Sequence, residues 1–296
     1  MNLLDFFVKS YGHFHDYKNV PFWVMTPFRR VLRKMANAAL PHYLPKIQTA
    51  QKRDEVEIIV SFTSFPARID MVWQVVLCML KQTLPPQKII LWLSRKQFSG
   101  DKDIPLRLKE LQGEVFQIRF VDGDIRSHKK YYYVSKEYPD SLIFLIDDDI
   151  YYPTDIIERS YNAYLKHKDS IICNYGYQIG YYNDGRLKPY REWKHVYSET
   201  VGNNLFFGSG AGTLFKPSFM HNDLTNIELA LELTPRADDI WLNAMAKLAM
   251  TPVCILSPGL YLPIISDTES LKSINNGESY NDVQLKSVEA FYGKCF

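Results

Sequence analysis

Three consecutive aspartates, Asp147, Asp148 and Asp149, directly follow the apolar run Leu142–Ile146. An uninterrupted apolar run is typical of a buried strand in an α/β sheet, and such sheets bind ligands where their strands end. Adjacent carboxylates repel one another unless a cation or hydrogen-bond donors neutralise them, and their oxygens suit Mg²⁺ or Mn²⁺, which often bridge to substrate phosphates. The pattern therefore predicts either a metal–phosphate site or a solvated acidic turn.

A second acidic pair, Asp238 and Asp239, opens the apolar-periodic segment 240–250. Carboxylates at a helix N-terminus are stabilised by the free N–H groups and the helix dipole, so capping is the local interpretation. The aspartate triplet suggests a second interpretation, a group transfer. One cluster would hold a metal and a leaving phosphate, while the other carboxylate takes a proton from an attacking hydroxyl.

The elements that must position these carboxylates alternate along the chain. Strands are predicted at 57–62, 88–93, 116–121 and 142–146, and helices at 69–81, 105–111, 129–137 and 154–166. This rhythm predicts an α/β fold with a mostly parallel central sheet flanked by helices. We expect a catalytic domain at 54–260, an N-terminal extension at 1–53, and a C-terminal segment at 261–296 that packs on the catalytic domain.

Two stretches have no clear period. Residues 175–202 are rich in Tyr, Gly and charge, and a long irregular segment in a compact domain is usually functional or mobile. Gly208–Gly212 (GSGAG) precedes an apolar stretch. The glycines permit either a close backbone approach to a ligand or a tight turn before a strand.

The N-terminal extension contains a predicted basic amphipathic helix, with Thr26 as N-cap, Pro27 in the first turn and Pro41 as its stop; residues 22–39 are the part that could contact a membrane. One face is apolar and the other basic. The apolar residues are Val24, Phe28, Val31, Leu32, Met35 and Ala39, and the basic ones are Arg29, Arg30, Arg33 and Lys34. Such a helix either lies on the anionic inner face of a membrane or packs its apolar stripe on the main domain.

The composition narrows the function classes. Lys+Arg 35 against Asp+Glu 33 is nearly balanced and predicts no nucleic-acid partner. Three of the four cysteines lie in apolar runs without metal-ligand spacing, which fits a reducing compartment. The sequence shows neither a signal-peptide pattern nor an apolar stretch of bilayer length, so we expect a cytoplasmic protein.

Several segments occur together and in order: the loop Ser61–Arg68, the basic segment Ser127–Tyr131, the aspartate triplet, the acidic segment Ala237–Trp241 and the pair Asn281–Asp282. In this order they resemble the GT-A nucleotide-sugar glycosyltransferases, most closely bacterial enzymes that build capsule, O-antigen or other surface polysaccharides. The resemblance spans residues 56–285 and rests on the order of several motifs rather than on one. It implies a Rossmann-like GT-A fold.

The resemblance also implies roles for the acidic residues. Asp149 and Asp147 would coordinate Mn²⁺ or Mg²⁺, Asp147 would also hydrogen-bond the donor ribose, and Asp148 would support the metal site. Asp239 would be the catalytic base of an inverting enzyme. The pair is Asp-Asp where many inverting relatives carry Glu-Asp, so Asp238 is an alternative base.

The nucleotide-sugar donor would be held by residues around the first strand and the basic segment. Ser61 and Thr63 belong to the loop that accepts the nucleotide in the family, and Arg68, Lys129 or Lys130 would contact the donor phosphates. For each charged residue the alternative is a surface salt bridge.

The sugar and acceptor would meet aromatic and glycine residues. Trp193 and Tyr190 would stack on a sugar face, with core packing as the alternative, and Gly210 and Gly212 would line the pocket. Together these roles imply the transfer of a hexose-type sugar from a nucleoside-diphosphate donor, with UDP favoured, to a hydroxyl of a glycan or lipid-linked acceptor. The competing hypotheses are another metal-dependent phosphate-transfer or hydrolysis enzyme and a non-catalytic nucleotide-sugar-binding protein.

Overall fold

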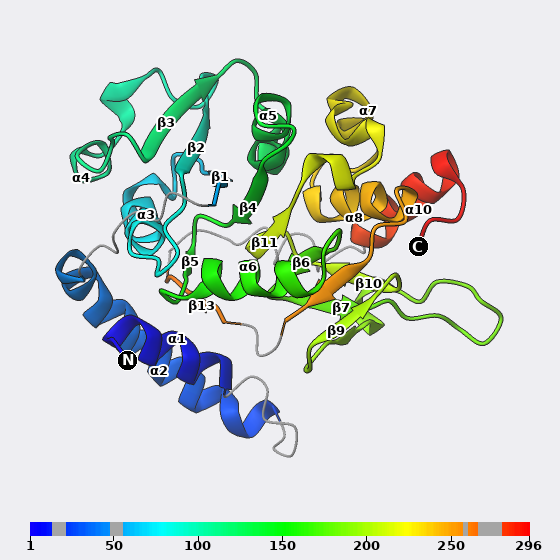
Figure 1. Ribbon diagram of the computed structural model, residues 1–296, viewed down its shortest axis with the longest axis horizontal. Coiled ribbons are helices and arrows are strands. Elements are labelled where there is room, and N and C mark those ends of the chain that lie inside the picture. The colour runs from blue at the N-terminus through cyan, green and yellow to red at the C-terminus, as the bar shows by residue number, and fades with distance from the viewer. Residues whose placement is uncertain (14–21, 48–55, 257–259, 266–279) are drawn as a thin grey trace.

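A central eight-stranded sheet forms the middle layer of the protein (Figure 1). The computed structural model describes residues 1–13, 22–47, 56–256, 260–265 and 280–296. The sheet order is β3-β2-β1-β4-β11-β6-β12-β9. Its strands are β1 Ile58–Thr63, β2 Lys88–Ser94, β3 Phe116–Val121, β4 Leu142–Ile146, β6 Ile171–Cys173, β9 Thr200–Gly202, β11 Ala211–Phe215 and β12 Val253–Ile255.

The four strands predicted from the apolar runs form one half of this sheet. β3, β2, β1 and β4 are neighbours and run parallel, whereas β11 runs antiparallel between β4 and β6. The predicted fold class, an α/β fold with a large, mostly parallel sheet flanked by helices, is confirmed. Because parallel strands present their carboxyl ends at one edge, the residues that follow β1 and β4 come together there.

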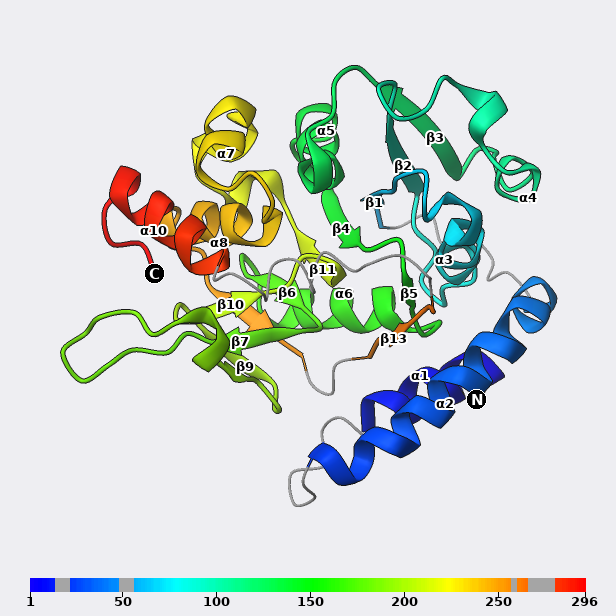
Figure 2. The ribbon, with the colours of Figure 1, turned by 180° about the vertical axis from the view of Figure 1, so that it is seen from behind.

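Alternate residues of a strand pack into two separate hydrophobic cores, one on each face of the sheet. Val60 and Phe62 of β1 point into one cluster, and Ile59 points into the other, as the two-residue period of a strand requires. The first cluster lies under α1, α2, α3, α4 and α6, and the second under α5, α7, α8 and α10 (Figures 1 and 2). The helices are α1 Leu3–His13, α2 Phe22–Tyr43, α3 Val72–Leu80, α4 Leu106–Lys109, α5 Lys129–Glu137, α6 Ile156–Lys166, α7 Ile227–Leu233, α8 Asp238–Leu248 and α10 Tyr280–Tyr292.

The tyrosine-rich segment 175–202 is more ordered than its sequence predicts. β7 Gly176–Gln178 pairs with both β8 Lys194–His195 and β10 Leu205–Phe207 in a three-stranded antiparallel sheet, and β9 joins the edge of the central sheet. The prediction of an irregular segment is therefore wrong for β7, β8 and β9, which are too short to show a period in the sequence. A further small sheet pairs β5 Ile150–Tyr151 with β13 Leu262–Pro263.

The N-terminal helices α1 and α2 lie side by side along one edge of the molecule (Figures 1 and 2). α2 begins before the predicted cap Thr26 and continues past Pro41, so both predicted ends are wrong. A proline φ near −65° fits a helix, and each proline removes a backbone hydrogen bond without ending α2. Within the described residues, no helix is both long and apolar enough to cross a bilayer.

The predicted apolar stripe of α2 is divided in the structure. Its members Leu32 and Ala39 pack against the core, as the packing interpretation expects, beside Ala36 and Leu40, which are buried but were not in the predicted stripe. Its other members do not follow them: Phe28, Val31 and Met35 are exposed. The stripe covers a wider arc than one packing contact can bury.

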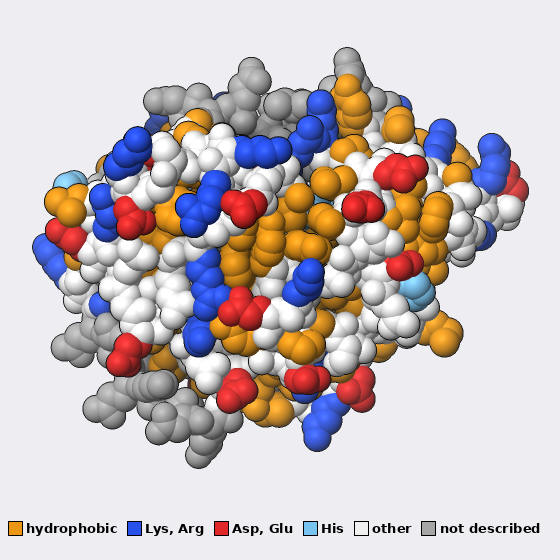
Figure 3. All heavy atoms as spheres, turned by 90° about the horizontal axis from the view of Figure 1, so that it is seen from above, with side chains coloured by type: hydrophobic (Ala, Val, Ile, Leu, Met, Phe, Trp, Pro, Cys, Tyr) orange, Lys and Arg blue, Asp and Glu red, His pale blue; other side chains and the backbone are white. Residues whose placement is uncertain are grey.

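One face of the molecule carries charges of both signs. On the face seen in Figure 3, basic and acidic side chains are interspersed with apolar ones.

Candidate active site

The aspartate triplet lies where β4 leaves the sheet, beside the start of β11. The backbone N–H of Asp147 donates to the Gly210 carbonyl over 3.0 Å and to the Tyr152 hydroxyl over 2.8 Å, and that hydroxyl donates to the same carbonyl. A Cβ atom on Gly210 would lie 1.7 Å from Asp147 Oδ2. Only glycine therefore leaves room for the Asp147 carboxylate in this position.

Arg68 fixes the second and third aspartates. Its Nη1 lies 2.8 Å from Asp148 Oδ1 and 2.9 Å from Asp149 Oδ2, and Ser64 Oγ donates to Asp148 Oδ2 over 2.6 Å. The Asp148 side chain is 8% exposed, against 27% for Asp149 and 40% for Asp147. Asp148 is thus an internal support, while the carboxylates on either side of it are open to a ligand.

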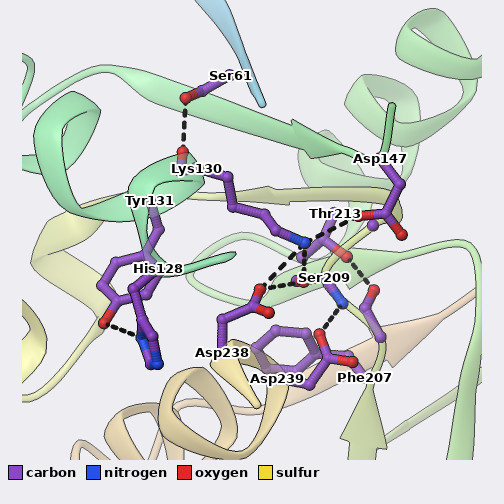
Figure 4. Close-up of polar contacts among 12 residues, drawn as sticks. Ser61, His128, Lys130, Tyr131, Asp147, Phe207, Ser209, Thr213, Asp238 and Asp239 are labelled. Atoms are coloured by element: carbon purple, nitrogen blue, oxygen red, sulfur yellow. Dashed lines mark hydrogen bonds and ion pairs between the residues drawn. The ribbon is translucent and has the colours of Figure 1, made fainter. Parts of the chain in front are cut away.

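Lys130 connects the two acidic motifs (Figure 4). Its Nζ lies 2.8 Å from Asp147 Oδ1, 3.1 Å from Asp238 Oδ2 and 3.0 Å from Ser209 Oγ. Asp147 Oδ1 and Asp238 Oδ2 therefore lie close together, because both contact the same Nζ atom. Burial lowers the pKa of Lys130, but the charges of Asp147 and Asp238 outweigh it and raise that pKa above its ordinary value. The ammonium is therefore permanently charged and holds the motifs together.

The first turn of α5 places this lysine. Ser61 Oγ on β1 donates to the Lys130 carbonyl and accepts a hydrogen bond of 2.9 Å from Trp92 Nε1 on β2. His128 is buried just before α5, and its Nε2 lies 2.8 Å from the Thr234 carbonyl in the segment leading to α8. These contacts join the strand edge to both helices that carry charged site residues.

Ser209 holds the second acidic pair at the start of α8. Its Oγ donates to Asp238 Oδ2 over 2.8 Å, and its backbone N–H donates to Asp239 Oδ1 over 2.7 Å. Burial by itself would raise the pKa of Asp238, but the charge of Lys130 holds it below its ordinary value. Burial and the charge of Asp238 raise the pKa of Asp239 to about 6. Asp238 thus stays ionised, while Asp239 can exchange a proton near neutral pH.

The aspartate triplet has a donor set that fits a divalent metal. Burial and the charges of Asp147 and Asp148 raise the pKa of Asp149 to about 7, so its negative charge calls for more positive charge than Arg68 provides. Asp147 and Asp149 offer hard carboxylate oxygens, which suit Mg²⁺ or Mn²⁺. Because Asp148 is turned toward Ser64 and Arg68, the protein would supply two carboxylates and leave the remaining positions to a phosphate ligand and water.

A different group of metal-type ligands lies near the C-terminal end of α6. Among the described residues, ligand atoms of His167, Glu199 and Cys254 come within 4.8 Å of one another. Lys166 Nζ already lies 2.7 Å from the Glu199 oxygen that His167 Nε2 contacts at 3.2 Å. This arrangement is that of a surface ion-pair group, and we do not assign a metal to it.

Several residues predicted to hold the donor are occupied by protein partners. Lys129 is buried and pairs with Asp124, and Thr63 Oγ1 donates to the Trp92 carbonyl over 2.8 Å. Ser61 is fully buried. Ser61 and Lys129 therefore hold other protein groups in place. Their positions in the sequence do not reveal this role.

The two predicted sugar-stacking residues separate in the structure. Trp193 is 5% exposed, packs against Phe206 and donates from Nε1 to the Lys188 carbonyl, so it is a core residue rather than a stacking surface. Tyr190 is partly exposed and contacts Trp193 and Tyr177. For Trp193 the structure therefore favours core packing, the alternative that the sequence left open.

Gly212 has a different role from Gly210. It has a φ of +94°, and a Cβ atom there would lie 2.8 Å from the Phe144 ring. Gly212 is buried within β11, where it permits close packing on β4. Its burial fits this packing role, and the pocket role that the resemblance implies stays a prediction.

A row of tyrosines borders Asp239. The Tyr175 and Tyr177 hydroxyls lie 2.6 Å apart, and the Tyr177 ring contacts both Tyr190 and His195. The negative charge of Asp239 contributes to raising the pKa of Tyr177 and of Tyr190, after burial. The three-stranded sheet thus places phenol groups within the electrostatic reach of the candidate base.

Sequence reasoning missed the neutral residues that organise the site. Ser209 bonds both aspartates of the second motif, Ser64 bonds Asp148, and Tyr152 bonds the Asp147 backbone. A serine inside a glycine run was a usable signal for Ser209, since such a run brings backbone N–H groups close to a ligand. The other two carry no local signal.

No family model matches the chain, and no curated protein matches it. Among solved structures, the 4-diphosphocytidyl-2C-methyl-D-erythritol synthase of Anaerococcus prevotii matches with a TM-score of 0.45 and 14% identity, over 78% of this chain and 97% of that one.

Proposed function

We propose that this protein is a metal-dependent glycosyltransferase. It transfers a hexose-type sugar from a nucleoside-diphosphate donor, with UDP as the nucleotide, to a hydroxyl of a glycan or lipid-linked acceptor in surface-polysaccharide synthesis. The transfer inverts the anomeric configuration. The motif order that resembles GT-A enzymes suggests this class, and the arrangement of the carboxylates supports it.

The main observation in support is that the Lys130 ammonium lies between the aspartate triplet and the second acidic pair. It contacts Asp147 of the triplet and Asp238 of the second pair, which lie far apart in the sequence. The proposed diphosphate site and the motif that carries the proposed base are therefore held next to the same side chain. Group transfer needs the diphosphate site and the proton acceptor close together, because the reacting carbon contacts the leaving oxygen and the attacking oxygen at once.

The proposed metal site is Asp147 and Asp149. A bound Mn²⁺ or Mg²⁺ would stabilise the negative charge that develops on the departing diphosphate. Arg68 holds Asp149 and Asp148, and Gly210 leaves the space that Asp147 fills. The chain thus fixes both ligands before any donor arrives, which lowers the cost of organising the site on binding.

Asp239 is the proposed base. The bond between the anomeric carbon and the donor phosphate oxygen breaks as the acceptor oxygen forms a new bond to that carbon, and the acceptor proton passes to the Asp239 carboxylate. A pKa raised to about 6 makes this carboxylate a stronger base than an ordinary aspartate while leaving it mostly ionised at pH 7. Asp238 is bonded by Lys130 and Ser209, so we assign it a positioning role.

Titration calorimetry with UDP-, GDP-, CMP- and dTDP-sugars, each with and without Mn²⁺, tests donor binding. We expect metal-dependent binding of one donor, lost in Asp149→Asn and retained in the control Asp101→Asn, an equal change of charge at an exposed aspartate. Donor binding that does not depend on metal, or that survives Asp149→Asn, would contradict the proposed metal site.

Product analysis tests the reaction class. Glycosyl transfer releases a nucleoside diphosphate, whereas nucleotidyl transfer releases pyrophosphate, and phosphorus NMR distinguishes the two. Proton NMR of the product linkage reports whether the anomeric configuration inverts. Pyrophosphate release would replace the glycosyltransferase proposal with nucleotidyl transfer, and donor binding without turnover on any acceptor would leave a binding protein.

A further inference from the structure

The outward face of α2 is apolar where a helix of a globular domain is normally polar. Phe28, Val31 and Met35 are 59%, 58% and 55% exposed. Their spacing of three and four residues puts them on one face of the helix. Ala36 and Leu40, on the opposite side, are fully buried against the domain. The exposed apolar face is therefore additional to the packing contact that holds α2 in place.

Basic residues border this apolar face. Arg30 and Lys34 are exposed, and together with Val31 and Arg33 they line a shallow hollow on the helix. The helix sequence FWVMTPFRRVLRKMANAALPHY contains four Lys or Arg residues and no Asp or Glu. This contrasts with the interspersed charges of both signs on the face shown in Figure 3. The α2 surface is complementary to negative charge and to apolar groups together.

We propose that α2 binds the surface of an anionic lipid bilayer, lying along it with Phe28, Val31 and Met35 inserted among the lipids. A row of lipid phosphates offers negative charge beside hydrocarbon, which matches Arg30 and Lys34 beside the apolar face. α2 lies on the membrane without crossing it, since none of the described helices can span one.

The contacts of α2 relate this surface to the active site. Asn37 Oδ1 accepts a hydrogen bond of 2.8 Å from the N–H of Ile265, and its side-chain amide donates to the Pro263 carbonyl over 3.3 Å. The adjacent Ile264 donates from its N–H to the Asp149 carbonyl over 2.7 Å. A bilayer-bound α2 would therefore hold the aspartate triplet at a fixed height above the membrane, which suits a lipid-linked acceptor. The binding itself does not depend on the proposed chemistry.

A matched pair of double variants tests the proposal on the full-length protein. Val31→Ser/Lys34→Glu alters the α2 face, and Val283→Ser/Lys286→Glu makes the same changes at the same spacing on α10. Val31 and Val283 are 58% and 56% exposed, and both lysines are exposed, so neither variant disturbs a core. α10 carries Asp282 and Glu289, unlike α2.

Vesicle co-sedimentation would be measured with phosphatidylcholine alone and with phosphatidylcholine containing 30% phosphatidylglycerol (about a third anionic, within the range where basic helices bind). We expect the wild-type protein to sediment with the anionic vesicles and to be released from them as the salt concentration rises. With neutral vesicles it should remain in the supernatant. Val31→Ser/Lys34→Glu changes the charge by two and should weaken binding about 30-fold, whereas the α10 variant should bind as the wild type does.

Three outcomes would overturn the proposal. The wild type fails to bind anionic vesicles, the two double variants bind equally well, or the α2 variant converts an oligomer into a monomer by light scattering, which would make this face an interface between copies of the chain. Donor calorimetry on the same variants separates this test from the proposed function. Loss of vesicle binding in the α2 variant with unchanged donor binding supports the proposal that α2 binds membranes. The vesicle result is valid whether or not any donor binds.

Discussion

Replacement of Lys130 by methionine tests the central contact of the site. Methionine keeps the length and apolar stem of lysine but removes the ammonium, which leaves Asp147 and Asp238 without their shared cation. Removing one partner of a buried ion pair costs about 3–5 kcal/mol because the remaining charge stays buried. For a chain of this length we expect the melting temperature at pH 7.5 to fall by about 5–8 °C.

The cost of Lys130→Met should depend on pH in a defined direction. In the wild type, Lys130 holds the pKa of Asp238 below its ordinary value, so this carboxylate adds stability above the pKa of the unfolded chain and loses it as the pH falls. Without the ammonium, burial raises the pKa of Asp238 instead. The variant should therefore recover part of its deficit as the pH is lowered from 7.5 to 5, because the buried carboxylate then takes up a proton.

Lys129→Met is the matched control. The Lys129 side chain is 3% exposed, close to the 7% of Lys130, but it pairs with Asp124 alone, whose side chain is 24% exposed and can rehydrate. We expect a cost of about 1–2 kcal/mol. Thermal unfolding of both variants at pH 5 and 7.5, followed by circular dichroism, compares them. Equal costs, or a Lys130→Met deficit that does not shrink at pH 5, would refute the reasoning.

Three further predictions follow from the site and its supports. Gly210→Ala should lower kcat/KM for sugar transfer by about 100-fold, since its Cβ would displace the Asp147 carboxylate by an ångström or more. With Asp239 as base, kcat/KM should level off above pH 6 and fall about tenfold per pH unit below it, as this carboxylate takes up a proton. Asp5→Ala should destabilise the protein by about 1–3 kcal/mol, because Asp5 is buried and accepts hydrogen bonds that tie α1 to the segment after the aspartate triplet. Lys9→Ala, which removes a half-exposed ion pair of the same helix, should cost less than about 1 kcal/mol by urea unfolding.

Each of these predictions has an outcome that would contradict it. Gly113→Ala is the control for Gly210→Ala, because a Cβ atom at Gly113 meets open space. Equal activity of the two alanine variants would show that the close approach at Asp147 is unimportant. A pH profile that is flat between 5 and 7 would exclude Asp239 as the base, and equal unfolding energies for Asp5→Ala and Lys9→Ala would show that α1 is not anchored through Asp5.

Local sequence was a good guide where one physical rule dominated. The apolar runs predicted β1 to β4 within a residue or so of their ends, and α5 runs from Lys129 to Glu137 as predicted. β1, β2 and β4 are buried on both faces, which leaves a nearly continuous apolar run in the sequence. The same rule placed the aspartate triplet at the end of a strand.

Local sequence failed where partners from distant segments decide the outcome. Trp193 could stack on a sugar or fill a core, and Phe206 and Lys188 placed it in the core. The ends of α2 were missed because a proline is compatible with a helix when neighbouring packing supports it. Leu32 is partly buried and Val31 is exposed, because only one arc of the helix meets the domain.

The sequence alone determined the alternation of strands and helices, the sheet edge that carries the carboxylates, and the excess of basic over acidic residues in α2. These follow from periodicity and residue type, which act over a few neighbouring positions. The tertiary structure decided that Lys130 stands between Asp147 and Asp238, and that Asp239 has a raised pKa while Asp238 does not. Such assignments depend on distances and burial between segments far apart in the chain, because electrostatic energies vary with separation and local dielectric rather than with position in the sequence.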